Sequence, residues 1–243
     1  MSTQAEIQDI LRPYVEQHPD LVLTGRAVIL RPVRHLMCGY YLDRTSAPGL
    51  VRLFWFAGMT YVPQRSRGFQ WAGEPVPRQS NILAADFQEC LYATMEAGFT
   101  ELRKHQDALT GFGINLRMYW DLPPSAEVEG LRCVAEGDLA GADRYLSLHV
   151  AGEKRGLEER LAFAGRHCRA GSRAWKREME IYETIKATLE RTMKLLDLVR
   201  AGDRPAVANL LREWEARQVE AWKVEKHWIS SPFPLETDGS PAV

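Results

Sequence analysis

The sequence lacks long apolar runs and carries almost no net charge. It contains no apolar run of about 18 residues, the length that a membrane-spanning helix needs. Its first 20 residues are polar and acidic, so we expect no secretory signal. A formal net charge of -1 over 243 residues gives no electrostatic reason to expect a nucleic acid or an anionic membrane as the partner. We therefore expect a cytoplasmic protein that makes no membrane contact.

Cysteine is scarce and scattered, and the common catalytic motifs are absent. The four cysteines, Cys38, Cys90, Cys133 and Cys168, form no C-x-x-C pair. This pattern favours reduced, mostly buried thiols over a disulfide framework or a zinc site. The sequence also contains no P-loop, no G-x-G-x-x-G, no H-E-x-x-H and no G-x-S-x-G. We predict no bound metal and no cofactor, and we favour a protein that is not an enzyme.

The first half of the chain is patterned as one helix followed by antiparallel strands. Apolar residues recur at helical spacing over residues 3–17. Residues 21–30 read as a tight hairpin in which Gly25 supplies a positive φ. Apolar and polar residues alternate over 34–44, and the strand of residues 50–62 runs back after a turn at 45–49. We predict an antiparallel meander over residues 21–63.

The last of these strands is apolar on both faces, which raises the question of what covers it. Leu53, Phe54, Trp55 and Phe56 follow one another without a polar break. A helix over residues 81–105, capped by Ser80 or Asn81, is the first candidate to cover one face. A further segment must cover the other face, and a homodimer through that face is one alternative.

The second half of the chain reads as helices. Residues 131–146 and 196–211 align at an offset of 65, and in each a glycine ends one helix and an aspartate caps the next. We therefore predict a helical repeat of two αα-hairpins, resembling TPR proteins in architecture but without their signature residues. The predicted organisation is an α+β meander domain over 1–122, a helical bundle over 123–229 and a mobile tail over 230–243.

The long loop between residues 63 and 80 contains the most distinctive group of surface candidates. Arg65 and Arg67 precede Phe69 and Trp71, and two cations followed by two aromatics suit either a protein hot spot or a stacked nucleic-acid base. The two aromatic residues alternatively pack into the second face of the apolar strand. A weaker candidate is His35, which an acid/base pair would place beside Asp43 or Tyr41.

These features favour a cytoplasmic binding protein that is not an enzyme. It would be an adaptor, an immunity-type inhibitor or an accessory subunit of a bacterial multi-protein system, possibly related to defence or toxins, with a protein as its partner. The alternative is a nucleic-acid-associated protein that uses Arg65, Arg67, Phe69 and Trp71. The second alternative is an enzyme whose active site carries no recognisable motif.

Overall fold

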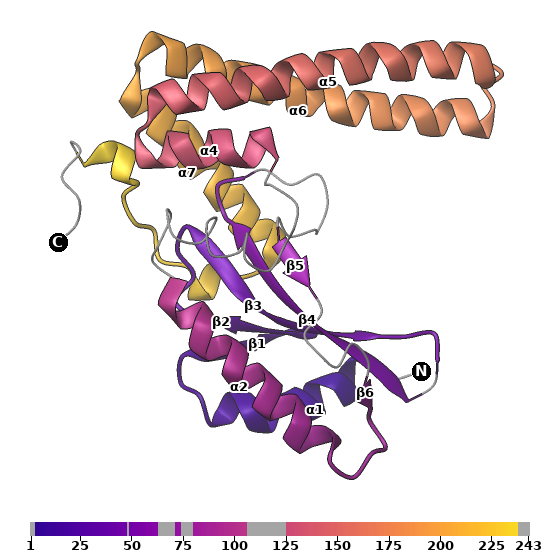
Figure 1. The fold of residues 1–243 in the computed structure, drawn as a ribbon, viewed down its shortest axis with the longest axis vertical. Helices are drawn as coiled ribbons and strands as arrows, with labels where there is room; N and C mark the ends of the chain where they lie inside the picture. Colours follow the sequence, from indigo (N-terminus) through magenta and orange to yellow (C-terminus); the bar gives the residue numbers. More distant parts are fainter. Residues whose placement is uncertain (1–2, 48, 63–70, 74–79, 106–124, 238–243) are drawn as a thin grey trace. The chain divides into compact units, whose positions relative to one another are not determined.

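The computed structural model describes residues 3–47, 49–62, 71–73, 80–105 and 125–237 (Figure 1). The chain divides into two units. The sheet unit comprises Met1–Phe112 and Trp214–Ser231, and the helical unit comprises Gly113–Glu213 and Pro232–Val243. The division falls inside helix α7 (Arg204–Trp222), so the last residues of this helix belong to the sheet unit.

The sheet unit begins with helix α1 (Gln4–Glu16). A capping box starts it: the Thr3 hydroxyl accepts a hydrogen bond from the Glu6 amide, and the Glu6 carboxylate accepts one from the Thr3 amide. These two bonds satisfy amides that have no partner within the helix. Pro13 lies inside the helix, and the buried side chains are Ile7, Leu11 and Tyr14. The predicted helix over residues 3–17 is confirmed.

A tight hairpin follows α1. Strands β1 (Leu21–Thr24) and β2 (Ala27–Leu30) pair antiparallel around Gly25 and Arg26. Gly25 has a φ of 62°, in the left-handed region that glycine adopts without the steric cost of a side chain. The positive φ predicted for Gly25 is confirmed.

The two long strands form the centre of the sheet. β3 (Leu36–Arg44) and β4 (Leu50–Met59) pair antiparallel along their whole length. Two short strands also pair with β4, namely β5 (Trp71–Gly73) and β6 (Ser80–Asn81). The order is β1-β2-β3-β4-β5, with β6 beside β4, and all neighbours are antiparallel. The predicted meander is confirmed.

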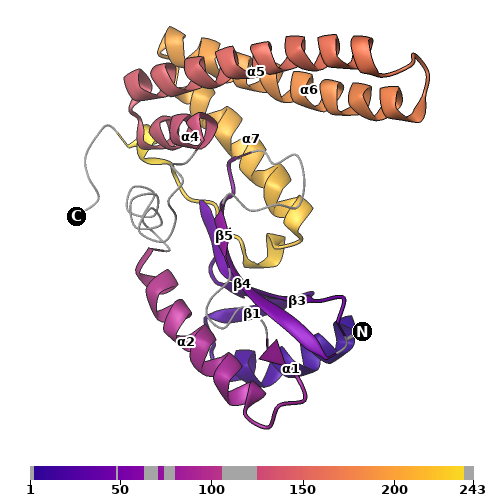
Figure 2. The ribbon, with the colours of Figure 1, turned by 45° about the vertical axis from the view of Figure 1, so that its right-hand side comes forward.

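One face of the sheet, which we call the first face, packs against α1 and α2 (Phe87–His105). Tyr40 of β3 points to this face, and its ring centroid lies 5.2 Å from that of Phe99 in α2. The Tyr14 ring of α1 is stacked 6.3 Å from Phe99. Figures 1 and 2 show both helices on the same side of the sheet.

The opposite, second face is covered in part by the end of α7 and the residues after it. Val219 and Val224 are buried in one apolar cluster with Ile29, Met37 and Phe56 of the sheet. Figure 2 shows this segment on the side of the sheet away from α2. A segment more than 150 residues further along the chain therefore covers the second face of the apolar strand.

The start of α2 differs from the prediction. Ser80 and Asn81 do not cap a helix; they form β6, with Asn81 opposite Leu50. The Asn81 side chain accepts a hydrogen bond from the Leu83 amide at 2.9 Å, and α2 begins only at Phe87. Leu83, which lies in the segment predicted as the first turn of the helix, is 82% exposed. Strand pairing with β4 and an Asx turn use the groups that would otherwise have capped a helix.

The helical unit consists of α4 (Ala126–Glu136), α5 (Leu139–His167), α6 (Arg173–Ala201) and the first part of α7. α5 packs against both α4 and α6. α5 and α6 run side by side as two long antiparallel helices (Figure 1). A turn at Gly171, with a φ of 78°, connects them.

The two Gly-Asp steps have the predicted cap geometry. Gly137 and Gly202 have φ values of 85° and 68° and end α4 and α6. Asp138 accepts a hydrogen bond from the Gly141 amide, and the Asp203 carboxylate accepts one from the Ala206 amide. Each step ends one helix and caps the next. That the two segments are a repeat stays a prediction.

The chain belongs to the α+β class, as predicted, with the helical part following the sheet. The predicted boundary between residues 122 and 123 lies outside the described residues. The predicted bundle of 123–229 differs from the observed division, because Trp214–Ser231 belongs to the sheet unit. Within the predicted tail, Phe233 and Leu235 are buried. Over the described residues, no helix has both the length and the apolar content needed to cross a membrane.

Candidate functional site: a pocket on the second face of the sheet

The predicted loop site is only partly within the described chain. Arg65, Arg67 and Phe69 lie outside the described residues. Trp71 is the first residue of β5, where its backbone is opposite Ala57 of β4. Whether these four residues form a binding site therefore stays a prediction.

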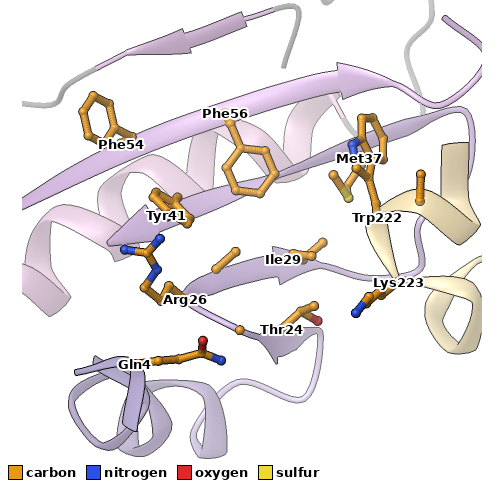
Figure 3. A pocket seen from close by; sticks show the side chains of 13 residues that line it. Gln4, Thr24, Arg26, Ile29, Met37, Tyr41, Phe54, Phe56, Trp222 and Lys223 are labelled. Atoms are coloured by element: carbon orange, nitrogen blue, oxygen red, sulfur yellow. The ribbon is translucent and has the colours of Figure 1, made fainter. Parts of the chain in front are cut away.

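The second face contains a cavity of about 720 Å³, which we call the sheet-face pocket (Figure 3). Strand pairing places side chains from four strands on its floor, because paired residues of neighbouring strands share a face. Thr24, Ala27, Tyr41 and Phe54 form one row across the sheet, and Ile29 and Phe56 belong to the next. All six line the pocket.

The end of α7 forms one wall of the pocket. Ala221, Trp222 and Lys223 line it there, beside Met37 of β3. Lys223 is the only non-glycine residue with a positive φ, 61°, among the described residues. Its left-handed conformation follows directly on the last residue of α7 and stops the helix at this wall. The pocket therefore occupies the part of the second face that this segment leaves uncovered.

The opposite side of the pocket is polar. Arg26, in the hairpin turn, forms an ion pair with Asp43 at 2.9 Å and lies over the Tyr41 ring at 4.9 Å from its centroid. Burial raises the pKa of the Tyr41 hydroxyl, the Arg26 charge lowers it, and Asp43 raises it further, with a net increase. Gln4 at the start of α1 also lines the pocket. A cation at each side thus borders an aromatic floor, since Lys223 lies at the α7 wall (Figure 3).

His35 lies next to neither of the partners that the sequence suggested. Asp43 lies near the end of β3 that is farthest from His35, and it forms an ion pair with Arg26 instead. The His35 ring contacts Glu215 of α7 and Ser231, with 3.0 Å from Nδ1 to the Glu215 carboxylate and 3.0 Å from Nε2 to the Ser231 hydroxyl. The interpretation of His35 as an acid/base partner of Asp43 or Tyr41 is therefore wrong.

Sequence reasoning missed every contribution of the α7 end to the second face. Trp222, Glu215 and Ser231 follow the end of β4 by more than 150 residues, and no spacing rule connects them to the sheet. The apolar character of β4 was the one available signal, because it required a cover without identifying it. Among the described residues, no group of three or more His, Cys, Asp or Glu side chains is placed to hold a metal ion.

Comparison with known proteins adds no relative to this description. No protein-family model matches the chain. Searches of the curated proteins and of the solved structures likewise found no match.

Proposed function

We propose that this chain is a cytoplasmic binding protein that holds a protein partner in the sheet-face pocket. The observation that carries the proposal is the composition of the pocket. The side chains that border it include two phenylalanines, a tyrosine, a tryptophan, a methionine and an arginine. Aromatic residues, methionine and arginine are the residues enriched at the centres of protein interfaces.

The partner class follows from the shape and charge of the pocket. Phe54, Tyr41 and Trp222 are only partly buried, so their apolar surface remains available to a partner. No ion pair of Lys223 is found within the described part of the chain, and its side chain is exposed. An apolar side chain on the aromatic floor with an acidic group beside Lys223 would complement both features. The preferred partner is therefore a protein segment with an apolar anchor next to an acidic residue.

The cellular setting extends this proposal. The cysteines are free thiols, and two of them, Cys38 and Cys133, are buried. Free buried thiols fit a reducing compartment, which supports the cytoplasm. There the chain would act as an adaptor, an immunity-type inhibitor or an accessory subunit of a bacterial multi-protein system.

A comparative pull-down tests the proposal. The tagged chain, its Phe54→Glu variant and its Leu83→Glu variant are recovered from native cells, and co-purifying proteins are quantified by mass spectrometry. Leu83 is the matched control, because it is an exposed apolar residue of the same unit that does not line the pocket. We expect Phe54→Glu to lose one stoichiometric partner at least tenfold while Leu83→Glu retains it.

The same samples with and without nuclease separate the alternatives. A partner that survives nuclease and depends on Phe54 supports the pocket as its site. Recovery of nucleic acid with a steep salt dependence would instead favour the nucleic-acid alternative. If Phe54→Glu and Leu83→Glu both lose the partner equally, or both retain it, the partner does not bind in the sheet-face pocket.

A further inference from the structure

Three polar side chains meet beside the start of β3, outside the sheet-face pocket. The Ser231 hydroxyl oxygen lies 3.0 Å from His35 Nε2, and His35 Nδ1 lies 3.0 Å from a Glu215 carboxylate oxygen. Glu215 is fully buried and His35 is 8% exposed, whereas Ser231 is half-buried. Serine, histidine and carboxylate thus form one chain of hydrogen bonds that runs from the interior toward the surface.

The roles of the two ring nitrogens depend on the tautomer of His35. In the tautomer that carries its proton on Nδ1, His35 donates to the Glu215 carboxylate, and its Nε2 accepts the hydrogen bond from the Ser231 hydroxyl. The Thr60 hydroxyl lies 2.5 Å from the same Glu215 oxygen and 3.0 Å from the Arg34 carbonyl oxygen, and it helps to hold the carboxylate in place. This is the arrangement in which a histidine activates a serine as a nucleophile.

Backbone pairing holds the serine segment beside the histidine. The Ile229 amide donates to the Val33 carbonyl at 2.8 Å, and the Val33 amide donates to the His227 carbonyl at 2.8 Å. Val33 lies two residues before His35, and Ile229 two residues before Ser231. Glu215 comes from a third element, α7. Support of this kind from separate elements is what holds a catalytic group within its productive geometry.

We propose that Ser231, His35 and Glu215 form a catalytic site that hydrolyses carboxylic esters. The Ser231 oxygen attacks the ester carbonyl carbon while His35 Nε2 takes the hydroxyl proton. The bond to the alcohol oxygen then breaks, and His35 gives that proton to the leaving alcohol. Water attacks the acyl-serine and loses a proton to His35, which returns it to Ser231 as the carboxylic acid leaves. Glu215 stabilises the imidazolium in both steps.

The test uses covalent labelling of the full-length chain by a fluorophosphonate probe, which forms a phosphorus–oxygen bond to an activated serine and releases fluoride. Intact-mass spectrometry counts the adducts, and peptide mapping locates them. Ser230→Ala is the matched control, because it removes the neighbouring hydroxyl and leaves Ser231 in place. Ser231→Ala, His35→Gln and Glu215→Gln remove one member each. Turnover of p-nitrophenyl butyrate is measured on the same set.

We expect a single adduct on Ser231 in the unaltered chain and in Ser230→Ala, and none in Ser231→Ala. His35→Gln should slow both labelling and turnover about 100-fold or more, since general-base catalysis contributes at least that factor. Circular dichroism checks that each variant is folded. If His35→Gln does not fold, Glu215→Gln provides the comparison. An unlabelled Ser231, or labelling that a folded His35→Gln or Glu215→Gln variant leaves unchanged, overturns the proposal.

Discussion

The hydroxyl of Tyr40 on β3 occupies the space where a side chain on Gly98 of α2 would lie. A Cβ atom built on Gly98 would be 1.5 Å from the Tyr40 hydroxyl oxygen. The contact brings α2 close to the first face of the sheet. A side chain at this position would therefore force the buried Tyr40 ring to move, which favours glycine here although it lowers the intrinsic stability of a helix.

We predict that Gly98→Ala lowers the free energy of unfolding by about 1–3 kcal/mol, the usual cost of overpacking a core. Gly152→Ala is the matched helix substitution, because nothing lies within 4 Å of a Cβ at Gly152 of α5. It should raise the free energy of unfolding by about 1 kcal/mol through helix propensity alone. Guanidinium unfolding followed by circular dichroism measures both changes. A neutral Gly98→Ala would contradict the close packing of α2 on β3.

The end of α7 provides a second stability prediction. Val219 is 1% exposed in the second-face cluster, and Val219→Ala should cost about 2 kcal/mol through lost apolar contacts and a residual cavity. Ile229→Ala is the control, because Ile229 is 51% exposed and should change the free energy of unfolding by less than about 1 kcal/mol. Thermal unfolding of the full chain measures both. Equal effects would mean that α7 does not cover the sheet.

A cluster of ion pairs makes the sheet unit sensitive to acid. The Glu96 carboxylate accepts a hydrogen bond from the Tyr14 hydroxyl at 2.7 Å and lies near His18 and Arg103. The Tyr14 hydrogen bond lowers the pKa of Glu96; burial raises it, but the nearby cations lower it further. Burial raises the pKa of Asp20, but the hydrogen bond and charge of Arg103 outweigh this and lower it overall.

Folding lowers the pKa values of both carboxyl groups. Their contribution to the free energy of unfolding is therefore complete above the pKa values of the unfolded chain, near 4, and is lost as the pH falls through the pKa values of the folded chain. Glu96 and Asp20 are partly exposed, so each should contribute no more than about 1 kcal/mol. We predict that Glu96→Gln lowers stability at pH 7 but not at pH 2. Urea unfolding at the two pH values measures this, and an equal loss at both would contradict the ion-pair account.

The thiols should differ in reactivity. Cys90 is exposed on α2, whereas Cys38 is 1% exposed and burial raises the pKa of its thiol to about 12. We predict that Ellman's reagent modifies Cys90 first in the native chain and modifies Cys38 only after unfolding, because the thiolate is the reacting species. Cys90→Ser serves as the control and should remove the fastest phase. Cys168 is also partly exposed, so the contradicting result is specific to Cys38: modification of Cys38 in the native chain, located by peptide mapping, would show that this buried thiol is accessible.

Local chemistry made much of the fold predictable. The helical spacing of residues 3–17, the positive φ of Gly25 and the Gly-Asp steps at 137–138 and 202–203 each act within a few residues, and each is present as expected. The start of α2 was not predictable, because Asn81 can cap a helix or pair with a strand, and the edge of β4 decides between them.

The site was predictable only as a requirement for a cover. The unbroken apolar run of β4 showed that both faces of the sheet need a cover, but the segment that covers part of the second face comes from the end of α7. The contact between His35 and Glu215 joins residues 180 positions apart. Such a contact is set by the packing of whole elements, so no short-range pattern encodes it.

The central claim is that the sheet-face pocket holds a protein partner, and site-specific photocross-linking tests it most directly. A photoreactive phenylalanine analogue replaces Phe54 in one chain and the exposed Leu83 in a matched control, and both are illuminated in native cells. We predict one discrete protein adduct from position 54 that is absent from position 83. No adduct at position 54, or the same adducts at both positions, would contradict the account.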